Sequence, residues 1–314
     1  MPQVSILMSV YKESLDWLRQ SIDSILEQTF TDFEFIIICD NPEYIEGIAL
    51  LNEYSKKEHR IKLVFNQVNI GLTKSLNKGI QMSNGYYIAR MDADDIALAD
   101  RLDKQVRFFQ AHPEVGVLGG GIEEFGRRSS VKLLPKTNCE MFLFVENCFA
   151  HPTVMAKADL LRKYLYNEDC RYAQDYELWY RMYRDGIVFY NLQEPLIKHR
   201  VSTEQVGFLH NDKQREVGKA VRRNSLNDYL KANYPNMDNL EGPVTMSFIK
   251  LIAKNVNLPK DSKEKLLYIM LLSLQNDEIS LPKLLLIIRS LRLRVSFGMS
   301  VIYHYIKRNT IQLI

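Results

Sequence analysis

Three closely spaced carboxylates, Asp92, Asp94 and Asp95, are the most chemically suggestive residues in this 314-residue chain. They follow a short, mostly apolar run after Gly85, a pattern typical of a buried strand. Like charges held this close repel one another, and each needs water or a cation. Mg²⁺ and Mn²⁺ prefer oxygen ligands and also bind phosphate oxygens of a substrate. The pattern therefore predicts a divalent-metal site, and the alternative is an acidic loop in which Asp95 or Asp100 caps the next helix.

Two further positions stand out later in the chain. Asp175 lies near the start of a predicted helix in which Leu178, Trp179 and Met182 recur at helical spacing. If Asp175 only caps this helix, it is an ordinary structural residue. His151 precedes a proline and would be equally ordinary as a packed histidine beside a turn. Both interpretations stay open on the residues alone.

Apolar and amphipathic segments alternate through the first 120 or so residues. The segment that leads into Asp92 is one of five predicted strands, and the other four are 4–10, 33–39, 61–65 and 115–118. Helices are predicted at about 15–27, 45–57, 71–80 and 100–112, with Asn84 and Gly85 closing the third. This alternation indicates a mostly parallel sheet with helices on both faces.

Polar residues follow the predicted parallel strands at 11–13, 40–41, 66 and 92–95. Because ligands bind such sheets outside the carboxyl ends of the strands, these residues are expected to surround a single ligand. The chain has neither a GxGxxG motif after its first strand nor a GxxxxGK[ST] motif. A dinucleotide fingerprint and an NTPase phosphate loop are therefore excluded.

Composition is that of a globular protein, with 46% hydrophobic and 25% charged residues. The length suits one large domain with an appendage, or two domains. The four cysteines form no CxxC pair, and the first strand is too short for the apolar core of a signal peptide. A cytoplasmic protein with reduced thiols is expected.

The net charge of +3 conceals a basic C-terminal tail. Residues 281–314 hold six lysines and arginines and no acid, which leaves −3 for the other 280 residues. Because the positive charge does not spread over the body, a general nucleic-acid-binding surface is not expected. Leu284, Ile288, Leu291 and Val295 form an apolar stripe in the tail. It could therefore bind an anionic membrane surface as a basic amphipathic helix, or pack on the body with its arginines in solvent.

The region after residue 200 changes character. Strand alternation stops, and helices are expected at about 204–232, 243–255, 261–275 and 281–308. No apolar run reaches the roughly 18 residues of a membrane span.

Five groups of residues together resemble the ordered motifs of family 2 glycosyltransferases, which have the GT-A fold. They are VSILMSVYKE at 4–13, NIGL at 69–72 with NKG at 77–79, GYYIARMDADD at 85–95, HPT at 151–153 and QDYELW at 174–179. The resemblance covers about residues 1–205 and is greatest to bacterial enzymes of capsule, O-antigen and lipopolysaccharide synthesis. It implies a GT-A domain, a Rossmann-like α/β fold, at 1–205 and a helical C-terminal region at 206–314.

The resemblance also implies residue roles. Asp94 would be the direct ligand of Mn²⁺ or Mg²⁺, and Asp175 would be the catalytic base. Lys74 would approach the diphosphate, and Asp40 would contact the uracil of a UDP-sugar. His199 lies one or two positions before the place where some members have a metal-binding histidine. The donor-binding residues would be Ser9, Val10, Tyr11, Glu13, Asp40, Lys74, Asp92 and Ala93, and further site residues would be His151, His199 and Trp179.

The implied activity is inverting, metal-dependent transfer of a sugar to a saccharide or lipid-linked saccharide acceptor. The metal stabilises the leaving diphosphate, and the base takes the proton of the acceptor hydroxyl. A membrane-bound tail would place the enzyme on the cytoplasmic face of the inner membrane. The alternatives are a non-catalytic nucleotide-sugar-binding partner and a sugar nucleotidyltransferase. The second expects a glycine-rich loop after the first strand, where this chain has Tyr11, Lys12 and Glu13.

Overall fold

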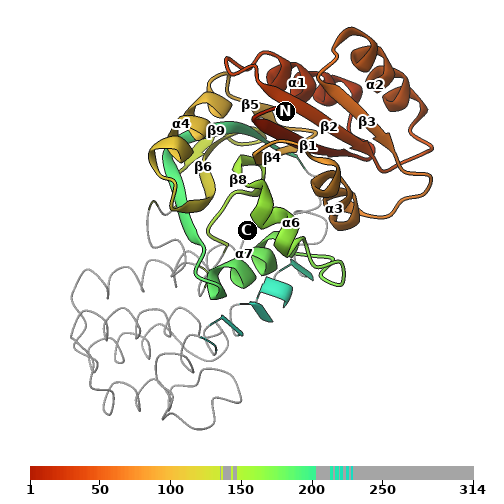
Figure 1. Ribbon diagram of the computed structural model, residues 1–314. Coiled ribbons are helices and arrows are strands. Elements are labelled where there is room, and N and C mark those ends of the chain that lie inside the picture. Colours follow the sequence, from red (N-terminus) through yellow and green to blue (C-terminus); the bar gives the residue numbers. More distant parts are fainter. Residues whose placement is uncertain are drawn as a thin grey trace, which may run out of the picture. The chain divides into compact units, whose positions relative to one another are not determined.

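A computed structural model of the chain describes residues 1–134, 136, 143 and 147–202, with isolated positions between 213 and 228. One compact unit comprises Met1–Phe142 and Asn147–Gly218. Within the described residues, nine strands form a single mixed sheet with helices on both faces (Figure 1). This architecture confirms the predicted α/β class and the GT-A arrangement.

Four parallel strands form the N-terminal half of the sheet, in the order β3-β2-β1-β4. Their side chains are mostly apolar on both faces, which is typical of strands covered on both sides. The two central strands, β1 and β2, are buried along almost their whole length. The four strands are β1 (Val4–Val10), β2 (Phe33–Cys39), β3 (Ile61–Phe65) and β4 (Tyr87–Asp92).

Helices α1 (Leu15–Leu26), α2 (Ile45–Lys57) and α4 (Arg101–Ala111) pack on one face of the sheet, and α3 (Leu72–Met82) packs on the other (Figure 1). The first face carries the main apolar core, to which alternate residues of β1 contribute. On the second face the Cα of Gly79 lies so close to the sheet that a Cβ there would meet the Ile38 side chain at 2.8 Å.

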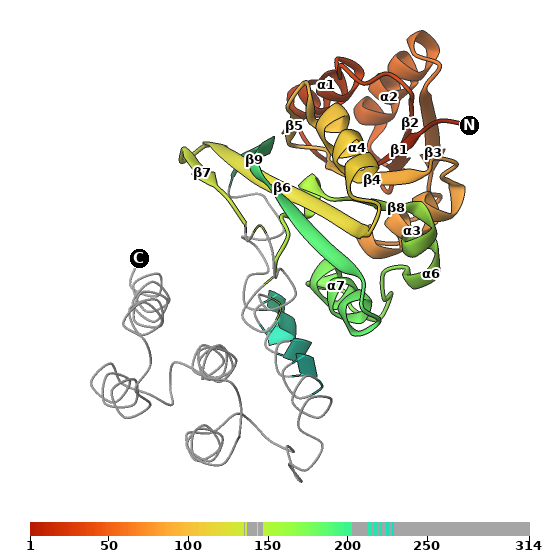
Figure 2. The ribbon, with the colours of Figure 1, turned by 60° about the vertical axis from the view of Figure 1, so that its left-hand side comes forward.

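The other half of the sheet is dominated by two long strands, β6 (Val115–Gly126) and β9 (Val188–Val201), which run parallel and side by side (Figure 2). The short strand β8 (Met155–Lys157) lies antiparallel between β4 and β6. At the outer edges, β5 (Ile96–Ala97) pairs with β9, and β7 (Ser130–Lys132) pairs with β6.

Three further short elements complete the unit. The 3₁₀ helix η1 (His151–Thr153) leads into β8, and α6 (Ala158–Tyr164) follows it. Helix α7 (Gln174–Arg184) then precedes β9. These elements lie beside β8 and α3, on the side of the sheet opposite α1 and α2 (Figure 1).

The sequence located the first elements closely, with β1, β2, α2 and β3 at the predicted residues. The predicted strand 115–118 continues to Gly126, and strands β7, β8 and β9 were not predicted. The C-cap predicted for Asn84 and Gly85 is wrong, because α3 ends at Met82 and Ser83 occupies the C-cap position.

Gly85 is instead required by close approach of the chain to β1. A Cβ at this position would lie 2.5 Å from the backbone nitrogen of Ser5. The backbone N–H of Gly85 donates to the Ser5 hydroxyl, and that of Asn84 donates to the buried Glu34 carboxylate. The turn before β4 is therefore fixed to β1 and β2, which sets the register of the strand that carries the carboxylates.

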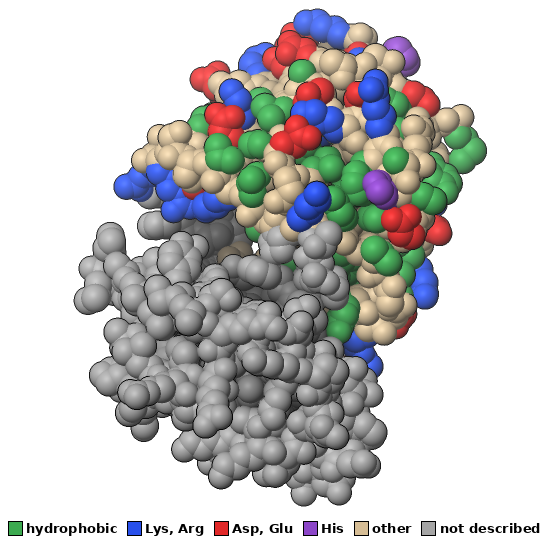
Figure 3. All heavy atoms as spheres, turned by 90° about the vertical axis from the view of Figure 1, so that its left-hand side faces the viewer, with side chains coloured by type: hydrophobic (Ala, Val, Ile, Leu, Met, Phe, Trp, Pro, Cys, Tyr) green, Lys and Arg blue, Asp and Glu red, His purple; other side chains and the backbone are tan. Residues whose placement is uncertain are grey.

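The predicted division at residues 205 and 206 stays a prediction, and the tail at 281–314 lies outside the described residues. The described positions between 213 and 228 are helical. No helix in the described part of the chain combines the length and apolarity needed to cross a membrane. Acidic and basic side chains are interspersed over the face of the described unit seen in Figure 3.

A buried carboxylate holds the β6–β7 hairpin together. Glu124 is 2% exposed and contacts Arg128, Ser130 and Lys132. Burial alone would raise the pKa of Glu124, but its hydrogen bonds to Arg128, Lys132 and Ser130 lower that pKa to about 2. The ionised form is thus strongly favoured in the folded protein.

This pKa predicts acid sensitivity of the hairpin. A carboxyl group whose folded pKa is depressed stabilises the protein above its unfolded pKa, near 4.5, and loses that contribution as the pH falls toward 2. The difference in unfolding free energy between wild type and Glu124→Gln should therefore shrink between pH 5 and pH 2 in urea titrations. Glu123→Gln, on the other face of the same strand, is the control. A pH-independent difference for Glu124→Gln would contradict this prediction.

Candidate functional site

The carboxyl ends of the four parallel strands bring the predicted polar residues to one edge of the sheet. Ser9 on β1 pairs directly with Asp92 on β4. On the other side of β1, the backbone N–H of Asp40 donates to the carbonyl of Val10, at 2.8 Å. The N–H of Asn66 in turn donates to the carbonyl of Cys39, at 2.9 Å. Residues from four segments of the chain are thus neighbours.

Asp40 holds the loop that leads into α3. Its Oδ1 accepts hydrogen bonds from the Asn66 side chain, at 2.8 Å, and from the backbone of Ile70, at 2.9 Å. Its Oδ2 accepts from the backbone of Gly71, at 2.8 Å. Gly71 has a φ of +86°, in the region that favours glycine. Asp40 is 3% exposed, so its carboxylate is committed largely to shaping this loop.

Glu13 lies beside the end of β1, where its carboxylate accepts a hydrogen bond from the backbone of Tyr11, at 2.9 Å. Burial raises the pKa of Glu13, and the negative charge of Asp92 raises it further. The Tyr11 side chain is 41% exposed at the same edge. Glu13 and Asp92 therefore belong to one acidic site.

Asp92 is kept ionised by a buried arginine on its own strand. The guanidinium of Arg90, a residue that is 5% exposed, forms an ion pair with the Asp92 carboxylate. Burial alone would raise the pKa of Asp92, but the charges of Arg90, His151, His199 and Arg101 together outweigh it and the pKa is lowered. The Asp92 carbonyl also accepts a hydrogen bond from the Ser21 hydroxyl, at 2.8 Å. Both the side chain and the backbone carbonyl of Asp92 are thus held in place.

Asp95 is fully buried and binds two consecutive residues of β9. Its carboxylate accepts hydrogen bonds from Nδ1 of His199, at 2.9 Å, and from the backbone of Arg200, at 2.8 Å. Burial raises the pKa of Asp95, although the His199 hydrogen bond opposes this. Burial would lower the pKa of His199, but the hydrogen bond to Asp95 and the charges of Asp95, Asp92 and Asp94 together outweigh it and the pKa is raised. Asp95 therefore joins the carboxylate loop to β9 rather than capping the next helix.

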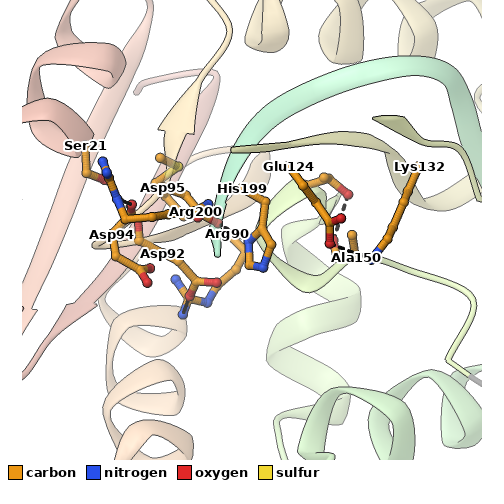
Figure 4. Close-up of polar contacts among 12 residues, drawn as sticks. Ser21, Arg90, Asp92, Asp94, Asp95, Glu124, Lys132, Ala150, His199 and Arg200 are labelled. Atoms are coloured by element: carbon orange, nitrogen blue, oxygen red, sulfur yellow. Dashed lines mark hydrogen bonds and ion pairs between the residues drawn. The ribbon is translucent and has the colours of Figure 1, made fainter. Parts of the chain in front are cut away.

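Asp94 lies between these two anchored carboxylates. Its backbone carbonyl accepts a hydrogen bond from Nε of Arg200, at 2.8 Å, and its negative charge contributes to the raised pKa of His199. Figure 4 shows the carboxylates of Asp92 and Asp94 and the His199 ring pointing to the same side of the loop. In the described part of the chain, no three His, Cys, Asp or Glu side chains are grouped closely enough to hold a metal by themselves.

The donor set nevertheless fits a hard divalent ion. Mg²⁺ and related ions keep several waters and take one or two carboxylates together with substrate phosphates, so a complete protein cage is not needed. A histidine that ligates a metal usually donates its other ring N–H to a carboxylate. His199 has this arrangement with Asp95, which would leave Nε2 to bind a metal.

A second polar group surrounds His151. Nε2 of His151 lies 2.8 Å from the Tyr166 hydroxyl. Burial lowers the pKa of His151, although the negative charges of Asp175 and Asp92 oppose this. Asp175 accepts a hydrogen bond from the Asn147 side chain, at 2.6 Å. Asp92 and Asp175 are thus both close enough to His151 to influence its pKa.

The remaining predicted residues are placed as follows. Asp175 is the second residue of α7, and the N-cap position is occupied by Ala173 in a left-handed conformation, so Asp175 is not the N-cap. Ala93 and Trp179 are buried. Lys74 is exposed on the first turn of α3, where the structure records no contact with the carboxylates.

Several residues of the site were not predicted. They are Arg90, Asn147, Tyr166 and Arg200, whereas Asn66 was expected among the polar residues at the strand ends. A sequence signal existed for Arg90, because an arginine inside a buried strand needs a nearby carboxylate.

A family model described as "Glycosyl transferase family 2" matches residues 5–166. An uncharacterized glycosyltransferase of Haemophilus influenzae is 30% identical over 295 residues, which is 89% of this chain and 88% of the relative. The O-antigen biosynthesis glycosyltransferase WbnJ of Escherichia coli is 30% identical over 256 residues, or 79% of this chain and 93% of WbnJ.

Two solved structures share the fold at low identity. S. aureus TarS 1–349 in complex with UDP-GlcNAc superposes with a TM-score of 0.58 at 16% identity, covering 96% of this chain and 89% of that one. The chain spans 52% of the longer TarS structure. The mannosyltransferase PcManGT from Pyrobaculum calidifontis, in complex with GDP-Man and Mn²⁺, gives 0.55 at 14% identity, covering 98% and 87%.

The contacts of Asp40 predict the effect of changing it to asparagine. Asp40→Asn keeps one acceptor oxygen and replaces the other with an NH₂ group. Because an NH₂ group only donates, the hydrogen bond from the backbone of either Ile70 or Gly71 is lost. The free energy of unfolding should fall by about 1–3 kcal/mol, the usual cost of an unpaired buried polar group. Amide hydrogen exchange at residues 70 and 71 should also become faster. Asp32→Asn, on the exposed turn before β2, is the control, and equal stability of the two variants would contradict the loop-holding role.

Proposed function

This chain belongs to glycosyltransferase family 2, and on that premise we propose that it moves a sugar from a UDP-sugar to a saccharide or lipid-linked saccharide acceptor. The process would be bacterial surface polysaccharide synthesis, which the likeness to WbnJ supports. The UDP-GlcNAc complex of TarS favours UDP as the nucleotide, while the GDP-Man complex of PcManGT makes GDP the alternative. The observation that carries the proposal is that the carboxyl ends of β1, β2 and β4 bring Ser9, Asp40 and Asp92 together at one edge of the sheet.

The donor would lie at the carboxyl ends of β1, β2 and β4. Ser9, Val10, Tyr11 and Glu13 would line the nucleotide pocket, with the exposed ring of Tyr11 available to the base. The loop shaped by Asp40 would form the wall beside the uracil, and Lys74 on the following helix would approach the diphosphate. Because Arg90 keeps it ionised, Asp92 would accept hydrogen bonds from the ribose or contact the metal-bound diphosphate.

Asp94 would hold Mn²⁺ or Mg²⁺ together with the donor diphosphate, with His199 as a second ligand steadied by Asp95. A bound metal ion would neutralise charge on the leaving diphosphate. Asp92 would be poised beside this ion, with its position set by Arg90 and Ser21.

Asp175 would take the proton of the acceptor hydroxyl as the hydroxyl oxygen attacks C1 of the sugar. The new bond joins the acceptor oxygen to C1, the bond from C1 to the diphosphate oxygen breaks, and the diphosphate leaves with its electron pair. Attack on the face opposite the leaving group inverts C1 in one step, so no covalent intermediate is needed. Asn147 would orient the Asp175 carboxylate through its 2.6 Å hydrogen bond.

Asp175→Asn tests the base. Asparagine keeps the size of the side chain and an acceptor oxygen, but it cannot take a proton. Transfer should fall by about a hundred- to ten-thousand-fold, the usual contribution of base catalysis, while donor affinity stays near that of wild type. Steady-state transfer and calorimetric donor titration measure the two effects. The control is Asp185→Asn at the C-cap of the same helix. Transfer by Asp175→Asn above about a tenth of the wild-type rate would contradict the assignment.

Asp94→Ala tests the metal site. Without this carboxylate the diphosphate should lose its metal bridge, so turnover should be abolished and metal-dependent binding of the nucleoside diphosphate should weaken. Calorimetric titration with UDP, with and without Mn²⁺, separates binding from chemistry. Asp103→Ala, which removes a half-buried acid paired with the exposed Arg107 on α4, is the control. Wild-type turnover in excess chelator would remove the metal from the proposed mechanism.

A further inference from the structure

A small cavity lies behind the site, between the sheet and helices α3, α6 and α7. It has a volume of about 10 Å³, close to the space that one water molecule needs. Most of its wall is aliphatic. Among the lining residues, only Arg90, Tyr166 and Trp179 carry polar side-chain groups.

Two of these three residues have buried hydrogen-bond donors without a partner. Nε of Arg90 and Nε1 of Trp179 are inaccessible to solvent and make no hydrogen bond. Arg90 is 5% exposed and Trp179 is fully buried. An unpaired buried N–H costs about 1–3 kcal/mol, so two of them on residues that line one cavity favour an acceptor inside that cavity. The wall supplies no carboxylate for this purpose.

The third polar residue, Tyr166, connects the cavity to His151. Its hydroxyl lies 2.8 Å from Nε2 of His151. If Nε2 carried the proton, the phenol O–H would need a different acceptor. The two other polar side chains at the cavity, Arg90 and Trp179, can only donate. The side chains at the cavity therefore favour donation by the phenol O–H to an unprotonated Nε2.

We propose that this cavity binds one structural water molecule, which fixes the tautomer of His151 through Tyr166. The water accepts hydrogen bonds from Arg90 and Trp179, which fills both of its acceptor positions. It then donates to the Tyr166 hydroxyl, and Tyr166 donates to Nε2 of His151. The proton of the neutral imidazole is held on Nδ1.

This network gives His151 a defined role beside the reacting groups. Its Nε2 lone pair is already used, and its Nδ1 is protonated, so His151 can donate a hydrogen bond but cannot act as a base. Among the groups around it, Asp175 is left to accept the proton. This last step rests on the proposed transfer reaction, whereas the water site and the tautomer do not.

Nitrogen-15 NMR of the full-length protein, labelled at histidine and tryptophan, tests the network without substrate. The chain has six histidines and two tryptophans, and the signals are assigned by their loss in His151→Gln and Trp17→Phe. Two-bond correlations should show His151 with a protonated Nδ1 and a bare Nε2. The indole proton of Trp179 should show cross-relaxation with a long-lived water.

Tyr166→Phe removes only the hydroxyl group, and it should convert His151 to a mixture of tautomers. Tyr164→Phe is the matched control, since Tyr164 lies two residues away and its hydroxyl contacts Asp185 instead. It should leave the His151 spectrum unchanged. A wild-type His151 protonated at Nε2, or a Trp179 indole proton without any water contact, would overturn the proposal. Both wild-type readouts hold even if Tyr166→Phe does not fold.

Discussion

The burial of positive charge beneath a group of carboxylates is the constraint on which this site depends. Asp92 and Asp95 lie within four residues of chain, and Glu13 is close enough for its pKa to respond to Asp92. Arg90, inside β4, balances this negative charge. The fully buried Arg101 donates a hydrogen bond to the backbone carbonyl of Arg90, at 2.8 Å. Burial lowers the pKa of Arg101 to about 9, the cost of keeping a second cation there.

Breaking a buried ion pair is costly because the remaining charge has no compensation. The pairing of Arg90 with Asp92 is therefore structurally important. The ion pair favours the ionised form of Asp92 at the end of β4. It does not involve the Nε–H of Arg90. The Arg90 side chain thus contacts the Asp92 carboxylate and also lines the cavity beneath α7.

The parts of the structure that the sequence predicted are those set by local burial. Strands β1 and β2 were located because both faces are covered, which produces continuous apolar runs. Asp92 and Asp94 were singled out because like charges seldom cluster without a reason. Strand β9 was missed because it is half-buried, interrupted by Pro195 and held by its partner β6 rather than by its own pattern.

Contacts between distant segments could not be read from the sequence. The carboxylate of Asp95 is hydrogen-bonded to residues about a hundred positions later, and that of Asp40 is hydrogen-bonded to a loop about thirty positions later. The helix that carries Asp175 begins directly after a left-handed Ala173, a residue type that gives no signal for that conformation.

The anchoring of Asp95 by β9 has a consequence for how this domain can be cut. The family model ends at residue 166, but the groups that neutralise Asp95 are at 199 and 200. A fragment that stopped at the end of that match would keep Asp92, Asp94 and Asp95 and lose α7 and β9. Asp95 would then lose both of its hydrogen-bond donors, His199 and Arg200, and removing one partner of a buried charge is strongly destabilising. The boundary of the family match is therefore not a boundary of folding.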